Sequence, residues 1–358
     1  MQILIFILVL SVLILVHELG HFMTAKLMGM RVEEFGIGYP PRAVKLFRWR
    51  GTDFTLNWLP FGGFVRIYGE EYDKDAKGQG MFWQKPKWQR AVVLLSGVIM
   101  NFLLGVVLFG VVYSVIGIPE VTDRVKIGGV AEGSPAEIVG IGEGDVLLWG
   151  EIEGERVEFK ESGDVINLVD GHKEEGILFG VEKEGGEVVE FEMVARESPP
   201  EGEGSLGVIL SMVEMVKYPW WQMPFRGIVI GTKEAVAWGR MILIGLGDMM
   251  RGIFAGEGVP EGVSGPIGVY QFSSQAVERG WLAVLQFTAV FSMNLAVLNI
   301  LPIPALDGGR IVFLGLEMIL GQKRKNKIEA AVNGVSMLLL VGLLILVSIR
   351  DVMRLLNP

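Results

Sequence analysis

Four long apolar runs constrain the fold of this 358-residue chain more than any other feature. They cover residues 3–27, 91–118, 281–301 and 332–349. Each is long enough to cross a bilayer, which takes about 20 apolar residues. The first run has no basic segment before it and no small-residue cleavage pattern, so we expect it to be retained as a helix rather than removed as a signal peptide. The pattern predicts an α-helical membrane protein with about four transmembrane helices.

The charges of the loops predict the orientation of these spans. Residues 28–89 carry ten basic and seven acidic side chains, and residues 322–327 carry four basic side chains in six positions. An excess of Lys and Arg in short loops marks the cytoplasmic side of a membrane. Both loops are therefore expected in the cytoplasm, which places the two chain termini and the segment between the second and third runs outside it.

The segment outside the cytoplasm is expected to fold as a small β-rich domain. Residues 118–215 hold 24 acidic and seven basic side chains and many glycines, and residues 187–194 alternate between polar and apolar. Alternation with period two is typical of half-buried strands. Residues 225–255 mix apolar and charged side chains, which favours an amphipathic helix on the protein or on the membrane surface. A fifth, partial span over the same residues stays open.

The first apolar run contains the motif H-E-x-x-H, as His17, Glu18 and His21. Residues four apart lie on one face of a helix, so the two imidazoles can bind one Zn²⁺ while the Glu accepts a proton from water. Ionisable groups inside a membrane span are costly and are usually functional. The alternative is a polar cluster that only packs helices together.

Catalytic zinc takes three protein ligands, so a third must come from elsewhere in the chain. His172, the one other histidine, lies in the acidic outer segment and is interpreted as a surface residue. The best candidate is Asp307, which follows two prolines and precedes two glycines after the third run. Non-helical backbone at membrane depth is tolerated where it lines a cavity. The alternative makes Asp307 the N-cap of a helix that begins near Gly309.

These motifs together resemble the site-2 protease family of intramembrane zinc metalloproteases, and the similarity covers almost the whole chain. The matching stretches are HELGH at 17–21, FGIG at 35–38, PFGGFVR at 60–66, WQR at 88–90, NF at 101–102, SGPIG at 264–268 and NILPIPALDGG at 299–309. Residues 133–136 and 140–147 resemble a single PDZ domain of the circularly permuted bacterial type. Two departures are Val98, where the family usually has proline, and residues 39–41 (YPP), where F-G-P is usual. Neither affects an expected zinc ligand.

The resemblance implies an order of domains along the chain. The expected parts are a first span with the H-E-x-x-H motif (1–29), a membrane-associated β-loop on the cytoplasmic side (30–89), a second span (90–118), a PDZ domain (119–215), an amphipathic helical region (216–280), a third span with the Asp307 segment (281–320) and a basic loop with the fourth span (321–358).

The resemblance also implies a function. The chain is expected to be a zinc-dependent endopeptidase of the inner membrane that cleaves transmembrane segments of single-span substrates, such as anti-sigma factors, in regulated intramembrane proteolysis. His17, His21 and Asp307 would hold the zinc near the cytoplasmic side, and Glu18 would activate water. Asn299 would hold the substrate backbone or oxyanion, although a helix-to-helix hydrogen bond suits it equally well.

The loop at Gly62, Gly63 and Phe64 would add a strand to an extended substrate, or else anchor the chain at the lipid headgroups. The PDZ groove would take peptide termini or strands and would exclude bulky substrates.

Two other classes of function fit less well. A non-proteolytic PDZ scaffold has no use for a general base beside a metal, and metal-ion transporters usually show internal repeats, of which we find none. The chain has no cysteine, which excludes thiol catalysis, disulfides and cysteine metal sites. A net charge of −9 without a long basic tract argues against nucleic acid as a partner.

Overall fold

The computed structural model describes residues 1–358 apart from 71–77, 184, 201, 257–264 and 357–358. The chain forms two compact units. One consists of Met1–Val115 together with Trp220–Pro358, and the other of Ile116–Pro219. The first unit carries the long apolar helices, and the second is mainly β-structure.

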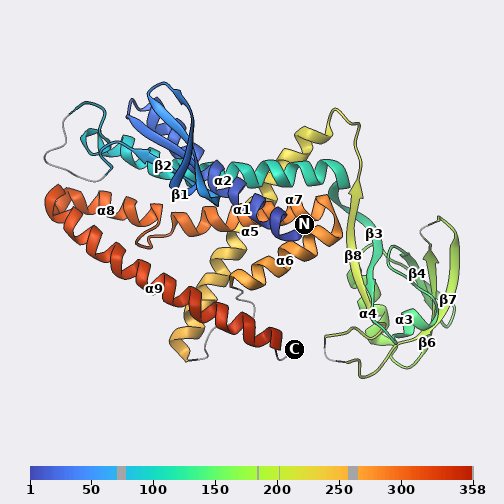
Figure 1. Ribbon diagram of the computed structural model, residues 1–358. Helices are drawn as coiled ribbons and strands as arrows, with labels where there is room; N and C mark the ends of the chain where they lie inside the picture. Colours follow the sequence, from blue (N-terminus) through green and yellow to red (C-terminus); the bar gives the residue numbers. More distant parts are fainter. Residues whose placement is uncertain (71–77, 184, 201, 257–264, 357–358) are drawn as a thin grey trace. The chain divides into compact units, whose positions relative to one another are not determined.

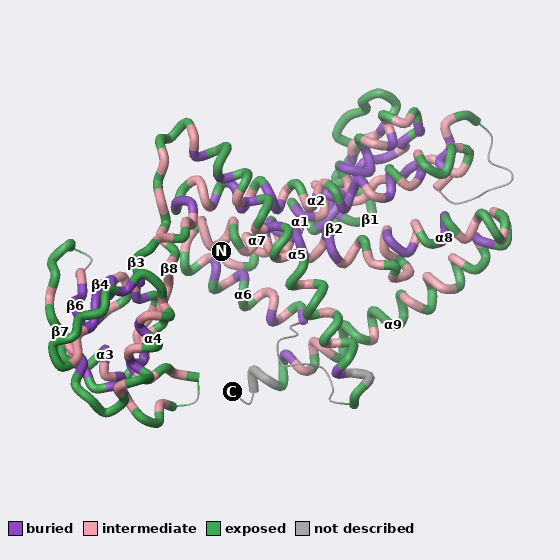
Figure 2. The backbone as a smooth tube through the Cα atoms, turned by 180° about the vertical axis from the view of Figure 1, so that it is seen from behind, coloured by how far each residue is buried: buried purple, intermediate pink, exposed green. Residues whose placement is uncertain are grey.

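Four helices of the described residues are long and apolar enough to cross a membrane. Each contains most or all of one predicted run: α1 (Gln2–Leu27), α2 (Lys87–Ile116), α7 (Trp281–Ile300) and α9 (Gln322–Leu356). The basic residues 322–327, expected in a loop, form the start of α9 instead. Figure 2 shows α9 as almost entirely exposed or intermediate along its length. Its apolar side chains include Leu338, 76% exposed, and Leu346, 66% exposed. Such a surface is unfavourable in water and suits contact with lipid.

The remaining helices of the first unit are shorter or more polar. They are η1 (Phe82–Gln84), α5 (Met223–Ala255), α6 (Pro266–Arg279) and α8 (Asp307–Leu320). The helix expected over residues 225–255 is therefore present as α5, which is not among the four spanning candidates. A Cβ at Gly231 of α5 would lie 2.5 Å from the main-chain oxygen of Val106 in α2, so the two backbones pack directly on each other. Buried Phe109, Ala235 and Met293 fill the space between α2, α5 and α7.

Strands β1 (Val32–Trp49) and β2 (Thr52–Ile67) form one antiparallel hairpin after α1. Arg50 and Gly51 connect them with φ of 46° and 82°, and a type I′ turn requires positive φ at both positions. The base of the hairpin packs on α1 through edge-to-face contacts of Phe22 with Phe35 and Phe54. Figure 1 shows the hairpin rising from this base beside α1. The hairpin corresponds to the β-loop expected within residues 30–89.

The second unit is a six-stranded antiparallel sheet with two helices. Its strand order is β7-β6-β4-β3-β8, with β5 paired to β4. The strands are β3 (Ile118–Val130), β4 (Val146–Ile152), β5 (Glu155–Glu158), β6 (Gly176–Glu182), β7 (Val188–Val194) and β8 (Val208–Val216), and the helices are α3 (Pro135–Ile138) and α4 (Ser162–Gly171). The alternating segment at 187–194 forms β7. Ile127, Leu147 and Phe179, all at most 1% exposed, lie at the centre of its core.

Candidate metal centre

His17 and His21 lie on one face of α1, as their spacing predicts, and each is 9% exposed. Asp307 comes from α8 and meets both of them. Its Oδ2 lies 2.9 Å from His17 Nε2 and 3.3 Å from His21 Nε2, and the two Nε2 atoms lie 3.1 Å apart. The structure therefore brings together the three residues that the sequence selected as zinc ligands.

The break between α7 and α8 puts Asp307 at this position. Helix α7 ends at Ile300, and Leu301 takes an extended conformation before two prolines. A Cβ at Gly308 would lie 2.3 Å from the main-chain oxygen of Ile300, so the new helix starts in close contact with the end of the old one. Helix α8 begins at Asp307 itself, with Leu306 as its N-cap and no side-chain capping bond. The N-cap alternative for Asp307 is therefore wrong.

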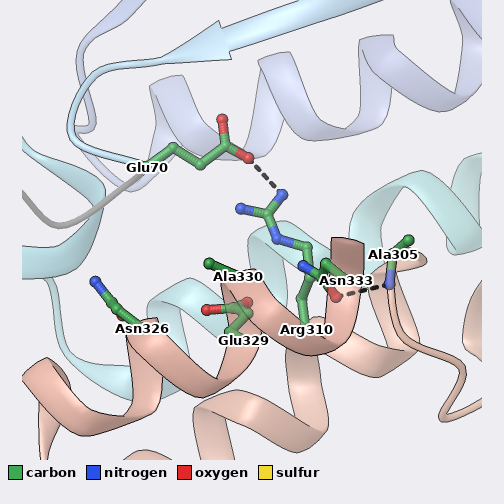
Figure 3. Close-up of a pocket in the computed structure, with 7 residues that line it drawn as sticks. All are labelled: Glu70, Ala305, Arg310, Asn326, Glu329, Ala330 and Asn333. Atoms are coloured by element: carbon green, nitrogen blue, oxygen red, sulfur yellow. Dashed lines mark hydrogen bonds and ion pairs between the residues drawn. The ribbon is translucent and has the colours of Figure 1, made fainter. Parts of the chain in front are cut away.

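Two contacts hold the segment between α7 and α8 in place. The residues that make these contacts line a polar cavity of about 550 Å³ (Figure 3). Asn333 of α9 accepts a hydrogen bond from the main-chain N–H of Ala305 at 2.9 Å. Ala305 has a φ of 71°, which is uncommon for a residue with a side chain. Arg310 forms an ion pair with Glu70, which follows β2, and so ties the first turn of α8 to the end of the hairpin.

The three ligand atoms fit a zinc ion. A tetrahedral ion with ligands at about 2.0–2.1 Å keeps those ligands about 3.3 Å apart, close to the separations between these atoms. His21 Nδ1 lies 2.8 Å from the main-chain oxygen of Val93. Because a carbonyl only accepts, Nδ1 carries the proton and Nε2 keeps a lone pair. Asp307 Oδ2 is buried and receives no hydrogen bond, although two imidazoles lie beside it. A buried carboxylate oxygen without a hydrogen bond, set beside two imidazole nitrogens, is an arrangement that a cation would satisfy.

Helix α2 forms the wall behind the two histidines. A Cβ at Gly97 would lie 2.6 Å from both His17 Cε1 and His21 Nε2, so only glycine leaves room for the two rings. A Cβ at Gly20 of α1 would lie 2.4 Å from the main-chain oxygen of Ser96. The two helices thus meet through glycines at the level of the metal centre.

Glu18 lines two cavities that adjoin the centre. One, of about 160 Å³, also contains Phe64 and Arg310, and the other, of about 280 Å³, contains Asn299 and Tyr39. Burial and the negative charge of Glu18 raise the pKa of the Tyr39 phenol, so this group remains a hydrogen-bond donor at neutral pH. Asn299 lies in the last turn of α7.

The other predicted residues lie close by or apart from the centre. Gly62 and Gly63 line neither of these two cavities. A Cβ at Gly62 would lie 2.6 Å from the Tyr39 ring, and one at Gly63 would lie 2.7 Å from Leu15, so these glycines let the hairpin approach α1. His172 belongs to the second unit, where its Nδ1 hydrogen-bonds the main-chain oxygen of Leu168 at 2.9 Å.

Sequence reasoning assigned no role to Tyr39, Gly97, Glu70 or Arg310. A glycine inside an apolar helix is a signal of close helix approach, which points to Gly97. Arg310 directly follows the Asp307 segment, but nothing in the sequence links it with Glu70, because the two residues are far apart along the chain.

Comparison with known proteins settles the family. The profile of peptidase family M50 matches residues 5–343 of the chain. The chain belongs to peptidase family M50. A protein of Fusobacterium nucleatum named "Putative zinc metalloprotease FN1322" is 31% identical, with all of both chains covered. "Zinc metalloprotease RasP" of Geobacillus kaustophilus is 27% identical over 98% of this chain and 97% of its own. This M50 protein is a zinc metalloprotease, and its long apolar helices suit a membrane-embedded one.

Proposed function

We propose that the chain is an intramembrane endopeptidase whose zinc is held by His17, His21 and Asp307 and whose general base is Glu18. The observation that carries this proposal is the convergence of His17 and His21, on a helix apolar enough to span a membrane, with Asp307 of α8, so that three possible ligand atoms lie within 4.8 Å of one another beside Glu18. Its substrates are transmembrane segments of single-span membrane proteins, including anti-sigma-factor-like proteins.

Zinc in such a site supplies Lewis acidity, which makes water nucleophilic at neutral pH. Glu18 accepts the proton of the attacking water and later donates it to the leaving amine. The cavity that contains Asn299 and Tyr39 has room for the scissile peptide, and both side chains can donate to a developing oxyanion. Asn299 serves this role or holds the substrate backbone.

The substrate has to be unwound, because a transmembrane helix hides its amides in its own hydrogen bonds. The β1–β2 hairpin supports a way to hold the unwound strand. Residues 34–37 of β1 pair with residues 53–56 of β2 on one side and with residues 63–66 of β2 on the other. The 63–66 part of β2 therefore keeps one edge that no described strand covers, and it contains Gly63 and Phe64, with Gly62 directly before them. An extended peptide adds readily to such an edge.

We further propose that the second unit is a PDZ domain that takes peptide termini or strands. A cavity of about 300 Å³ supports this role, with Val165 and Val169 of α4 on one side and Leu206, Val208 and Leu210 on the other. The domain would lie outside the cytoplasm with both chain termini, and the metal centre would lie toward the cytoplasmic side of the inner membrane. From outside the cytoplasm, the PDZ domain would exclude substrates that have not been trimmed by an earlier cleavage.

The first experiment compares the unaltered chain with Glu18→Gln on a single-span substrate in liposomes, together with the zinc content of each. We expect one zinc per chain in both proteins and cleavage lost only in Glu18→Gln. Glu33→Gln makes the same change of charge on β1, where Glu33 faces Arg31 at 3.7 Å, and is expected to cleave normally. Unimpaired cleavage by Glu18→Gln would refute the role of Glu18, and absence of zinc would favour a PDZ scaffold.

The proposed exclusion of untrimmed substrates by the second unit is tested by excision of that unit. Ile118 and Val216 are paired across β3 and β8, so the unit enters and leaves at adjacent points. A short Gly/Ser linker can therefore replace residues 118–216. We expect this variant to cleave untrimmed substrates as well as trimmed ones. Unchanged selectivity would contradict the exclusion of untrimmed substrates by the second unit.

A further inference from the structure

We propose that Asn101 is a positioning residue for the metal centre: its side-chain oxygen accepts the Nδ1 proton of His17 and so reserves the Nε2 lone pair of His17 for zinc. This inference rests on the proposed zinc site. It extends that site to α2, which supplies no ligand itself.

Three residues of α2 face the two histidines. Val93, Gly97 and Asn101 are spaced by four, so they form one stripe along the helix. The main-chain oxygen of Val93 lies 2.8 Å from His21 Nδ1, and Gly97 leaves room for both rings. The side-chain amide of Asn101 lies 3.4 Å from His17 Nδ1. Each histidine therefore meets its own polar group on the same helix face.

The hydrogen-bond chemistry of the Asn101 amide favours the same role. Asn101 is fully buried, and its Oδ1 has no hydrogen-bond partner when Nδ2 is the atom that faces His17. That orientation also makes Nδ1 of His17 the acceptor, which puts the ring proton on Nε2, among the ligand atoms. Rotation of the amide by half a turn lets Oδ1 accept from Nδ1–H and frees Nε2 for a metal, while Nδ2 takes the position that has no hydrogen-bond partner.

The role of the Asn101 side chain is separate from the packing of α2 against α7. Ser292 of α7 donates a hydrogen bond to Asn101 at 2.7 Å, but it does so to the main-chain oxygen. A substitution of the Asn101 side chain keeps that acceptor, whereas Ser292→Ala removes the interhelical bond and leaves His17 untouched. The two roles can therefore be altered independently.

The test measures the zinc dissociation constant of the full chain in detergent, by competition with a chelator, for Asn101→Leu, Asn101→Asp and Ser292→Ala. Groups that orient a metal-binding imidazole typically contribute about 10–100-fold in affinity, and this is the loss we expect for Asn101→Leu. Asn101→Asp keeps an acceptor for Nδ1–H and should bind zinc within about threefold of the unaltered chain, as carboxylates do in many zinc sites. Ser292→Ala should lower the melting temperature without weakening zinc binding.

Three results would overturn the inference. One is zinc binding by Asn101→Leu within twofold of the unaltered chain. Another is a tenfold loss in Asn101→Asp, since that variant replaces only the donor half of the amide. The third is an equal loss in Ser292→Ala, which would assign the effect to helix packing. If the unaltered chain binds no zinc, the proposed metal site itself fails, which is a different outcome from a normal site insensitive to Asn101.

Discussion

Arg90 and Glu317 form a buried ion pair between α2 and α8, the helix that begins with Asp307. Two hydrogen bonds of 3.0 and 2.8 Å join the guanidinium to the carboxylate, and the side chains are only 5% and 9% exposed. Removal of one partner leaves the other charge buried, unpaired and out of contact with water. For a buried pair this costs about 3–5 kcal/mol of folding free energy. We therefore expect Arg90→Leu and Glu317→Leu each to destabilise the first unit by this amount.

The double variant distinguishes a buried pair from two separate contacts. The double variant contains no unpaired buried charge. We therefore expect the double variant to be at least about 2 kcal/mol more stable than either single variant. The assay is equilibrium unfolding in mixed micelles, followed by tryptophan fluorescence. The exposed pair of Arg251 and Asp248, 87% and 62% exposed, is the control, and Arg251→Ala should change stability by less than about 0.5 kcal/mol. Single variants that lose under 1 kcal/mol, or additive losses in the double variant, would refute the reasoning.

Three further predictions concern the metal centre and the second unit. Gly97→Ala places a Cβ 2.6 Å from both imidazoles and should abolish zinc retention. Gly334→Ala, the control, has open space around the new Cβ and should retain zinc. The zinc content of both variants is measured by elemental analysis. Removal of the metal with a chelator should stop peptide hydrolysis. Zinc added at 1,000 times its dissociation constant should restore hydrolysis and raise the free energy of unfolding by about 4 kcal/mol. Hydrolysis that survives chelation would contradict a metal-dependent reaction.

Finally, hydrogen bonds from the main-chain N–H groups of Lys160 and Glu161 lower the pKa of Asp164, which stabilises the start of α4. The folded-state pKa lies below the unfolded one, so this stabilisation is present at neutral pH and disappears as the pH falls through the folded-state value. The stability difference between the unaltered chain and Asp164→Ala should shrink in acid, and a constant difference would contradict the assignment.

Local rules were enough for much of this protein. The length and composition of four runs predicted the apolar helices, and a spacing of four predicted that His17 and His21 share a helix face. The prolines and glycines around Asp307 predicted a break in the backbone there. The resemblance of the motifs to a known family then predicted the zinc protease. Apart from that resemblance, which covers almost the whole chain, each of these properties depends on residues that are close together in the sequence.

The tertiary structure alone decided which groups surround the metal centre. Apart from the face with His17 and His21, helix α1 has no polar stripe that would indicate which of its residues meet α2 or which residues of α2 they meet. The contacts of Gly97 and Asn101 with the histidines, and of Arg310 with Glu70, depend on how separate elements are rotated and stacked. Packing between distant segments fixes these rotations, and a uniformly apolar sequence cannot encode them locally. The sequence therefore selected the three proposed ligands, and the packing of α2 and the hairpin determined which residues surround them.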